Sequence, residues 1–232
     1  MNNMVKIMLK LILIIALIIS FPKTIVHTKE TVKPAVKQVE KEVKNKSIYI
    51  YSTHQEEEYK GGDVMDGSEY LMELLVDQGY EVKVDQNDFS LYRIKNDMDY
   101  DECYSVSKKY ILQELDNKND YDLIIDFHRD SIPKDLSTIT YDNKSYAKVM
   151  FVVGKGSENY KDVKKMSSSL SSIINEHIPK LSRGIYEKKS HYNQGLAKNM
   201  VLIEVGANKN TYQEVKNTIH ILAYAIDQYL SQ

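Results

Sequence analysis

The chain has very few of the residues that cross-link small secreted proteins. Among its 232 residues there is one cysteine, Cys103, and no tryptophan. A single thiol excludes an internal disulfide framework, and it also excludes a zinc site built from cysteines. Any metal ion in this protein must therefore be held by histidine and carboxylate side chains.

Two common catalytic motifs are missing as well. No serine lies in a Gly-x-Ser-x-Gly pattern, which argues against a serine esterase. No His-Glu-x-x-His pattern occurs, which argues against a zincin-type protease. A metal-dependent site in this chain is therefore of another kind.

Charge is unevenly distributed along the chain. The formal net charge is -2, but residues 1–46 carry nine lysines against three glutamates, which is +6 and leaves -8 on the remainder. An acidic folded part argues against nucleic acid as a partner. A content of 42% hydrophobic and 28% charged residues is typical of a soluble globular domain.

The first 22 residues have the pattern of an export signal. Lys6 and Lys10 precede an uninterrupted apolar stretch at residues 11–21. Counted back to Val5, this stretch approaches the roughly 20 residues that span a bilayer. Because no small-x-small cleavage site follows, we favour a retained membrane anchor over a cleaved signal. The sequence thus predicts an extracytoplasmic protein of a bacterial cell envelope, anchored or secreted.

Residues 23–46 predict a stalk between this segment and a folded domain. They are rich in lysine, valine and glutamate, and they lack glycine and sustained apolar periodicity. A coil of this length is a tether. Its positive charge suits an anionic membrane or wall polymer, and it is equally compatible with simple solvation. Residues 47–232 then form one domain.

Strand and helix patterns alternate from residue 47 onward. Runs of β-branched and aromatic residues predict strands at residues 48–52, 81–84, 123–127, 149–153 and 201–205. Apolar residues at helical spacing predict helices at residues 69–78, 104–115, 163–178 and 211–230. Residues 138–146 predict a hairpin beside the sheet. This alternation predicts an α/β fold, in which a mainly parallel twisted sheet of about six strands is flanked by helices.

Three apolar runs end in side chains that can bind or serve a metal ion, namely His54, His128 and Glu204. Ligands bind at the carboxyl ends of strands in open α/β sheets, so we expect these side chains to meet. Zinc-dependent amide hydrolysis requires three protein ligands, an open position for water and a general base. His54 and His128 are the first two candidate ligands. Glu204 lies within an apolar strand, where burial of an ionised group is costly, and is the candidate base.

The residues alone leave the third ligand open. Glu69 opens a predicted helix and could point back toward His54. It could equally serve only to complement the helix dipole. Glu57 is the competitor, in an acidic run that is ordinarily a solvated turn. Arg129 could hold a substrate carboxylate in a bidentate fork, or it could pair with a neighbouring aspartate.

Four segments carry a family resemblance. They are residues 51–59 (YSTHQEEEY), 125–131 (IDFHRDS), 192–196 (YNQGL) and 202–206 (LIEVG), the last followed by Asn210 and Thr211. In this order they resemble the stage II sporulation protein P family over residues 47–231, although Ser52 stands where the family usually has histidine. The resemblance implies a zinc-dependent N-acetylmuramoyl-L-alanine amidase, which cuts the amide joining glycan to stem peptide in peptidoglycan. Cleavage of peptide cross-links is a further implied activity.

The same resemblance assigns roles to individual residues. His54 and His128 match metal ligands for Zn²⁺, and Glu204 matches the catalytic carboxylate. The spacing of related amidases favours Glu69 as the third ligand. Arg129 together with Asn193 and Gln194 is expected to bind substrate. The implied partners are peptidoglycan, a membrane through the N-terminal segment, and a cell-wall enzyme.

Two other functions fit the same sequence. An amidase that has lost a metal ligand would be a non-catalytic cell-wall-binding module. Whether a third ligand reaches a metal ion together with His54 and His128 distinguishes this module from an active enzyme. A zinc endopeptidase that cuts only peptides would use the same residues, and product analysis would separate it from an amidase.

Overall fold

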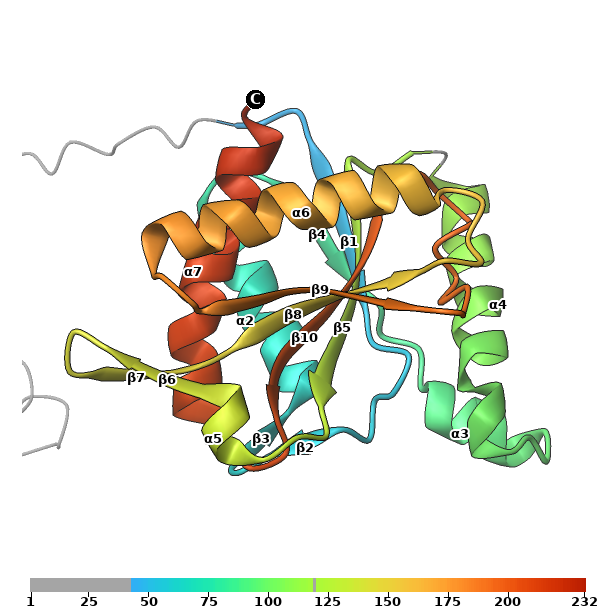
Figure 1. Cartoon of the computed structure of the whole chain (residues 1–232). Coiled ribbons are helices and arrows are strands. Elements are labelled where there is room, and N and C mark those ends of the chain that lie inside the picture. The colour runs from blue at the N-terminus through green and yellow to red at the C-terminus, as the bar shows by residue number, and fades with distance from the viewer. Residues whose placement is uncertain (1–42, 119) are drawn as a thin grey trace, which may run out of the picture. The chain divides into compact units, whose positions relative to one another are not determined.

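A six-stranded sheet forms the centre of the domain (Figure 1). Its strand order is β4-β1-β5-β10-β8-β9, and β4, β1, β5 and β10 run parallel to one another. β8 pairs antiparallel with β10 and parallel with β9, so the last two strands run the opposite way. The strands are β1 Ser47–Tyr51, β4 Glu81–Val84, β5 Leu123–Asp130, β8 Val149–Gly154, β9 Ser182–Lys188 and β10 Met200–Ala207. The predicted mainly parallel α/β sheet is confirmed.

The computed structural model describes residues 43–118 and 120–232. The predicted anchor at residues 1–22 and most of the predicted stalk lie outside these residues. In the part that is described, none of the helices combines the length and the apolarity needed to cross a membrane.

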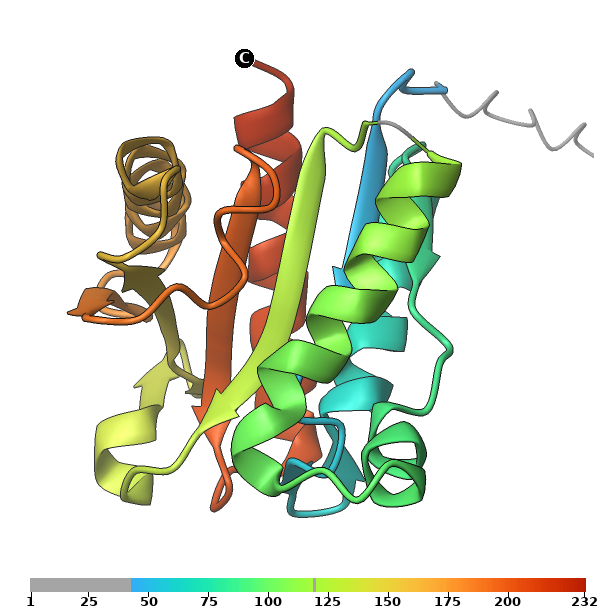
Figure 2. The same ribbon diagram turned by 90° about the vertical axis from the view of Figure 1, so that its right-hand side faces the viewer.

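Helices cover both faces of the sheet (Figure 2). One face packs against α2 Val64–Asp77, α6 Tyr160–His177 and α7 Tyr212–Leu230, around buried side chains such as Ile48, Phe127 and Ile203. The other face packs against α3 Phe89–Lys95 and α4 Cys103–Asn117, and there the strands contribute Tyr49 and Tyr51. Shorter elements are β2 Glu58–Tyr59, β3 Gly62–Asp63, η1 Tyr100–Glu102, α5 Lys134–Ser137, β6 Thr138–Tyr141 and β7 Lys144–Ala147.

The differences from the sequence prediction that bear on the site concern α2 and β9. The first helix begins at Val64, five residues before Glu69, because Asp63 caps it and forms a capping box with Asp66. Strand β9 was not predicted at all.

The predicted hairpin is confirmed as β6 and β7. Its turn residues Asp142 and Asn143 have φ of +47° and +58°, as a two-residue hairpin turn requires.

The first described residues are fixed to the amino end of the sheet. The Lys44 ammonium forms an ion pair with Asp227 near the end of α7, and the Lys46 ammonium donates to the Leu230 carbonyl. The backbone N–H of Lys44 donates to Gly79 O at 3.0 Å. The last residues of the predicted stalk are therefore part of the packed domain, at the edge where β1 begins.

Glu214 joins the start of α7 to the hairpin side of the domain. Its carboxylate accepts from the Thr211 N–H at 2.8 Å, as part of a capping box, and from Asn210, Ser145 and Lys134 at 3.2, 3.0 and 3.1 Å. Burial alone would raise the pKa of Glu214, but these donors outweigh it and lower the pKa to about 2.

Glu214→Gln should therefore destabilise the domain in a pH-dependent way. A carboxyl whose folded pKa lies below its unfolded value of 4.5 stabilises the fold above pH 4.5, and this stabilisation is lost as the pH falls toward 2. We expect the variant to lose about 2 kcal/mol of unfolding free energy at pH 7. The deficit should shrink below pH 4. Urea unfolding followed by circular dichroism at several pH values measures both.

The exposed Glu176 of α6 provides the matched control, since Glu176→Gln removes the same charge from a solvated position. It should change the unfolding free energy by less than about 0.5 kcal/mol. A deficit in Glu214→Gln that is equal at pH 3 and pH 7 would show that the carboxylate charge is not the source of the stabilisation.

Candidate active site

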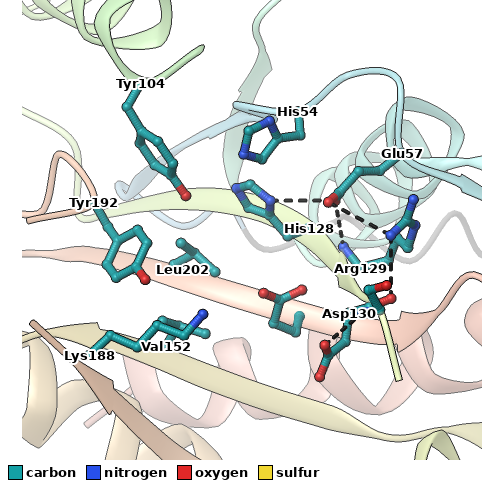
Figure 3. A pocket seen from close by; sticks show the side chains of 12 residues that line it. His54, Glu57, Tyr104, His128, Arg129, Asp130, Val152, Lys188, Tyr192 and Leu202 are labelled. Carbon is teal, nitrogen blue, oxygen red and sulfur yellow. Dashed lines mark hydrogen bonds and ion pairs between the residues drawn. The ribbon is translucent and has the colours of Figure 1, made fainter. Parts of the chain in front are cut away.

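His54, His128 and Glu204 line one pocket at the carboxyl ends of the parallel strands (Figure 3). The pocket has a volume of about 270 Å³. Strand register accounts for the arrangement, because Glu204 of β10 is paired with His128 of β5, and Tyr51 of β1 is paired with Asp126. His54 follows β1 by three residues, and its ring centroid lies 5.2 Å from that of His128.

The His128 ring lies between two carboxylates. Its Nε2 is 2.8 Å from Asp126 Oδ1, at an angle too poor for a hydrogen bond, and its Nδ1 is 3.4 Å from Glu57 Oε2. Asp126 is itself fixed, because its two oxygens accept from the N–H and the hydroxyl of Thr53, each at 2.9 Å. Because the fixed Asp126 carboxylate lies beside Nε2, the Nδ1 side of the ring faces Glu57 in the pocket.

Of the two candidate third ligands, the structure brings Glu57 to the pocket and not Glu69. Glu57 lines it, and Arg129 donates its backbone N–H to Glu57 Oε2 at 2.9 Å. Glu69 lies exposed in α2 and does not line the pocket. The physical reason is the early start of α2, since Glu69 occupies the second turn, on its solvent side, rather than the helix end beside His54.

Burial and charge set unusual proton affinities in the pocket. Burial raises the pKa of Glu204 to about 7, and although a charged His128 opposes this shift, Glu57 and the nearby aspartates add to it. Burial lowers the pKa of His54, and the neighbouring His128 lowers it further. Burial also disfavours a charged His128, but Asp126 and Glu57 outweigh it and raise its pKa. A group with a pKa near 7 can exchange protons at neutral pH.

The donor set fits a divalent cation. As they stand, no three His, Cys, Asp or Glu side chains of the described residues converge closely enough to hold one. The separation of 3.4 Å between His128 Nδ1 and Glu57 Oε2 is nevertheless close to the roughly 3.4 Å between two tetrahedral ligands with bonds of about 2.1 Å. Across residues 43–118 and 120–232, buried His54 Nδ1 and Glu204 Oε2 find no hydrogen-bond partner. A buried polar atom without a protein partner is a position at which an ion or a water molecule can bind.

Arg129 holds the loop that carries Glu57. Its Nε donates to the Glu58 carbonyl at 3.2 Å, and its guanidinium lies 4.0 Å from the Glu57 carboxylate. It forms no ion pair with the carboxylate of Asp126 or of Asp130, and its Nη1 donates instead to the Asp130 backbone carbonyl at 3.5 Å. In this geometry its contacts hold Glu57, and its binding of substrate stays a prediction.

The side chains of Asn193 and Gln194 also form hydrogen bonds within the protein. The Asn193 amide donates to Tyr104 O and Ser107 Oγ, both at 3.0 Å, and Gln194 is buried between the Gly154 N–H and the Val152 carbonyl, at 2.8 Å from each. Both residues anchor the loop after β9, and Gly154 lets that loop approach closely, because a Cβ there would lie 2.4 Å from the Ser190 carbonyl oxygen.

The anchored loop places Tyr192 in the pocket, with Tyr104 and Lys188 as further lining residues. Tyr192 and Asn193 have φ of +50° and +57°, a left-handed backbone that is uncommon for tyrosine and more readily adopted by asparagine. None of these three lining residues was predicted as part of the site, although Tyr192 lies in the YNQGL segment that carries the family resemblance. A left-handed backbone and a bulged strand have no pattern in composition or periodicity.

Comparison with known proteins gives a family match over most of the chain. The family model described as Stage II sporulation protein P (SpoIIP) matches residues 21–227. Stage II sporulation protein P of Bacillus subtilis (strain 168) is 31% identical over 198 residues, which are 77% of this chain and 49% of that protein. The chain thus spans about half the length of the curated relative that it matches.

Solved structures resemble the domain in fold. The CwlD amidase from Clostridioides difficile, in complex with the GerS lipoprotein, matches 81% of this chain and 99% of its own, with a TM-score of 0.56 and 17% identity. The N-acetylmuramyl-L-alanine amidase Ami1 from Mycobacterium smegmatis matches 82% of this chain and 99% of its own, with a TM-score of 0.51 and 10% identity. At these identities the likeness confirms the amidase-like fold alone.

Proposed function

Because the chain belongs to the stage II sporulation protein P family, we propose that it is a zinc-dependent peptidoglycan hydrolase that cuts the amide between N-acetylmuramic acid and L-alanine. Cleavage of peptide cross-links is a second activity within this proposal. Its setting is the bacterial cell envelope during sporulation, outside the cytoplasmic membrane, with a membrane anchor in residues 1–22 and with another cell-wall enzyme as a partner.

One observation carries the proposal. Glu204, a buried carboxyl with its pKa raised to about 7, lies in the same pocket as His54, Glu57 and His128. This combination supplies a general base beside two imidazoles and a carboxylate, which is the set that zinc hydrolysis requires. The amidase-like fold supports it, because the pocket lies at the carboxyl ends of the strands.

His54, Glu57 and His128 would hold the ion. Zinc, when bound, supplies Lewis-acid chemistry that acidifies water and polarises the amide carbonyl. Asp126 keeps the His128 ring oriented, and Arg129 holds the Glu57 carboxylate through its backbone N–H. In this mechanism Glu204 takes a proton from the attacking water and returns it to the leaving amine. A pKa near neutrality suits both proton transfers.

Digestion of purified peptidoglycan tests the function directly. The full chain, with zinc and with a chelator, is incubated with the polymer, and the soluble fragments are analysed by mass spectrometry. We expect free stem peptides that depend on zinc. Shortened cross-links without free stems would identify a zinc endopeptidase. Binding to the polymer without soluble products would identify a non-catalytic wall-binding module, and either result would overturn the proposed amidase.

A further inference from the structure

A second hollow continues the catalytic pocket toward the edge of the sheet. It has a volume of about 300 Å³ and shares Asp130, Val152, Lys188 and Glu204 with the catalytic pocket. Its other lining residues come from β8, from β9 and from the segment between β5 and β8. A substrate whose scissile bond lies at Glu204 would therefore extend into this hollow, which we call the β9 groove.

A bulge in β9 gives the groove its chemical character. Between Val149 and Phe151 of β8 there is one intervening residue, whereas their partners Ser182 and Ile185 are separated by two. Gly184, with φ of +86°, lies in this bulge. In a regular strand Arg183 would point away from Tyr186 and Lys188, because side chains alternate between faces. The extra residue brings all three to the groove.

The two cations of the groove differ in their partners. Arg183 is ion-paired with Asp130, whose other oxygen accepts from the Ser131 N–H at 2.7 Å. The Lys188 ammonium makes no ion pair or hydrogen bond with any residue that the structure describes, and it lies 5.3 Å from the centre of the Tyr186 ring. Figure 3 shows Lys188 extending into the pocket beside Val152 and next to Tyr192. Of the two cationic side chains that line the β9 groove, Lys188 is therefore the one without an ion pair among the described residues.

We propose that Lys188, in the groove shaped by Arg183 and Tyr186, binds a free carboxylate of the substrate's peptide and makes the protein prefer acidic stem peptides. The inference rests on the proposed function. The lactyl carboxyl of the glycan half is consumed in the scissile amide, so the peptide half is the half that carries free carboxylates. A lysine with no internal partner provides a charge-assisted contact for such a group.

Two muramoyl dipeptides that differ in one group provide the test. In one the second residue carries a free α-carboxylate, and in the other it carries a carboxamide. For the full chain we expect a KM about fivefold lower for the acid than for the amide, as one charge-assisted hydrogen bond would give. Lys188→Gln should remove this preference by raising the KM for the acid alone, with kcat nearly unchanged, and Lys188→Arg should restore it.

Lys189→Gln is the matched control, because Lys189 is the exposed neighbour in sequence and lines neither hollow. A preference for the acid that survives in Lys188→Gln would overturn the inference while leaving hydrolysis intact. If neither dipeptide is cut, calorimetric binding of the same two compounds decides the inference separately. Tighter binding of the acid that is lost only in Lys188→Gln would support it, and equal binding of both would overturn it.

Discussion

Glu204→Gln should reduce the rate of peptidoglycan hydrolysis by about 10³-fold, the scale on which positioned general bases act. Glutamine has nearly the same shape as glutamate and can still accept a hydrogen bond, but it cannot take a proton from water. Glu204 is not among the proposed metal ligands, so the variant should bind as much zinc as the wild type. Release of muropeptides and zinc content by elemental analysis measure the two quantities.

The same substitution has an expected effect on metal-free protein that does not depend on catalysis. Burial raises the pKa of Glu204 to about 7 from 4.5, so the folded state loses stability relative to the unfolded state as the pH rises through this interval. Removal of the charge should therefore stabilise metal-free protein at pH 8 by about 2 kcal/mol and leave it unchanged near pH 4. Thermal unfolding at the two pH values measures this difference.

Three results would contradict the role of Glu204 as the general base. Full muropeptide release by Glu204→Gln would show that another group is the base. Loss of zinc from the variant would show that Glu204 is a ligand rather than a base. A wild-type rate in a variant that is also stabilised at pH 8 would confirm burial of the charge and exclude its use in catalysis.

Glu57→Gln should weaken zinc binding by at least about 100-fold, which exceeds the usual cost of losing a residue that merely orients a ligand. The carboxylate provides one of the donors that face His128, at 3.4 Å from its Nδ1, and an amide oxygen is a poorer ligand for zinc. His128→Ala, which removes an imidazole donor, should lose zinc as well. Competition with a chromogenic chelator measures the affinity.

Glu69→Gln is the matched comparison, because it makes the same chemical change at the position that family spacing favours. Glu69 is exposed in α2, so its variant should bind zinc as the wild type does. The reverse pattern, with zinc lost from Glu69→Gln and kept by Glu57→Gln, would return the third ligand to Glu69. Retention of zinc by both variants would remove both residues from the site.

The sheet and its terminal helix were predictable because their patterns are local. Five of the six central strands contain runs of β-branched or aromatic residues, and α7 begins with the capping box of Thr211 and Glu214. Strand β9 was missed because it contains arginine, glycine, glutamate and lysine, as a bulged strand at the sheet edge can. Its apolar content was too low to give a strand signal.

The site was predictable in part for the same reason. His54, His128 and Glu204 each follow or lie in a recognisable strand, and parallel strands bring their carboxyl ends together. The choice between Glu57 and Glu69 depended on where α2 begins, and that start is set by the Asp63 cap rather than by apolar spacing.

Residues joined only through tertiary contacts gave no signal in the sequence. The amide of Asn193, a predicted substrate-binding residue, contacts Ser107, which lies 86 positions earlier. No local pattern in the chain encodes such a contact.

The contacts of Lys44 and Lys46 lie at the edge of the sheet opposite the catalytic pocket. The chain joins the domain at the edge where β1 begins, and the pocket opens where β1, β5 and β10 end. An extended chain from Lys46 to His54 is at most about 26 Å long. The reactive groups therefore lie about one strand length from Lys44 and Lys46. A polymer that reaches the pocket from the carboxyl ends of the strands therefore does not have to pass Lys44 and Lys46.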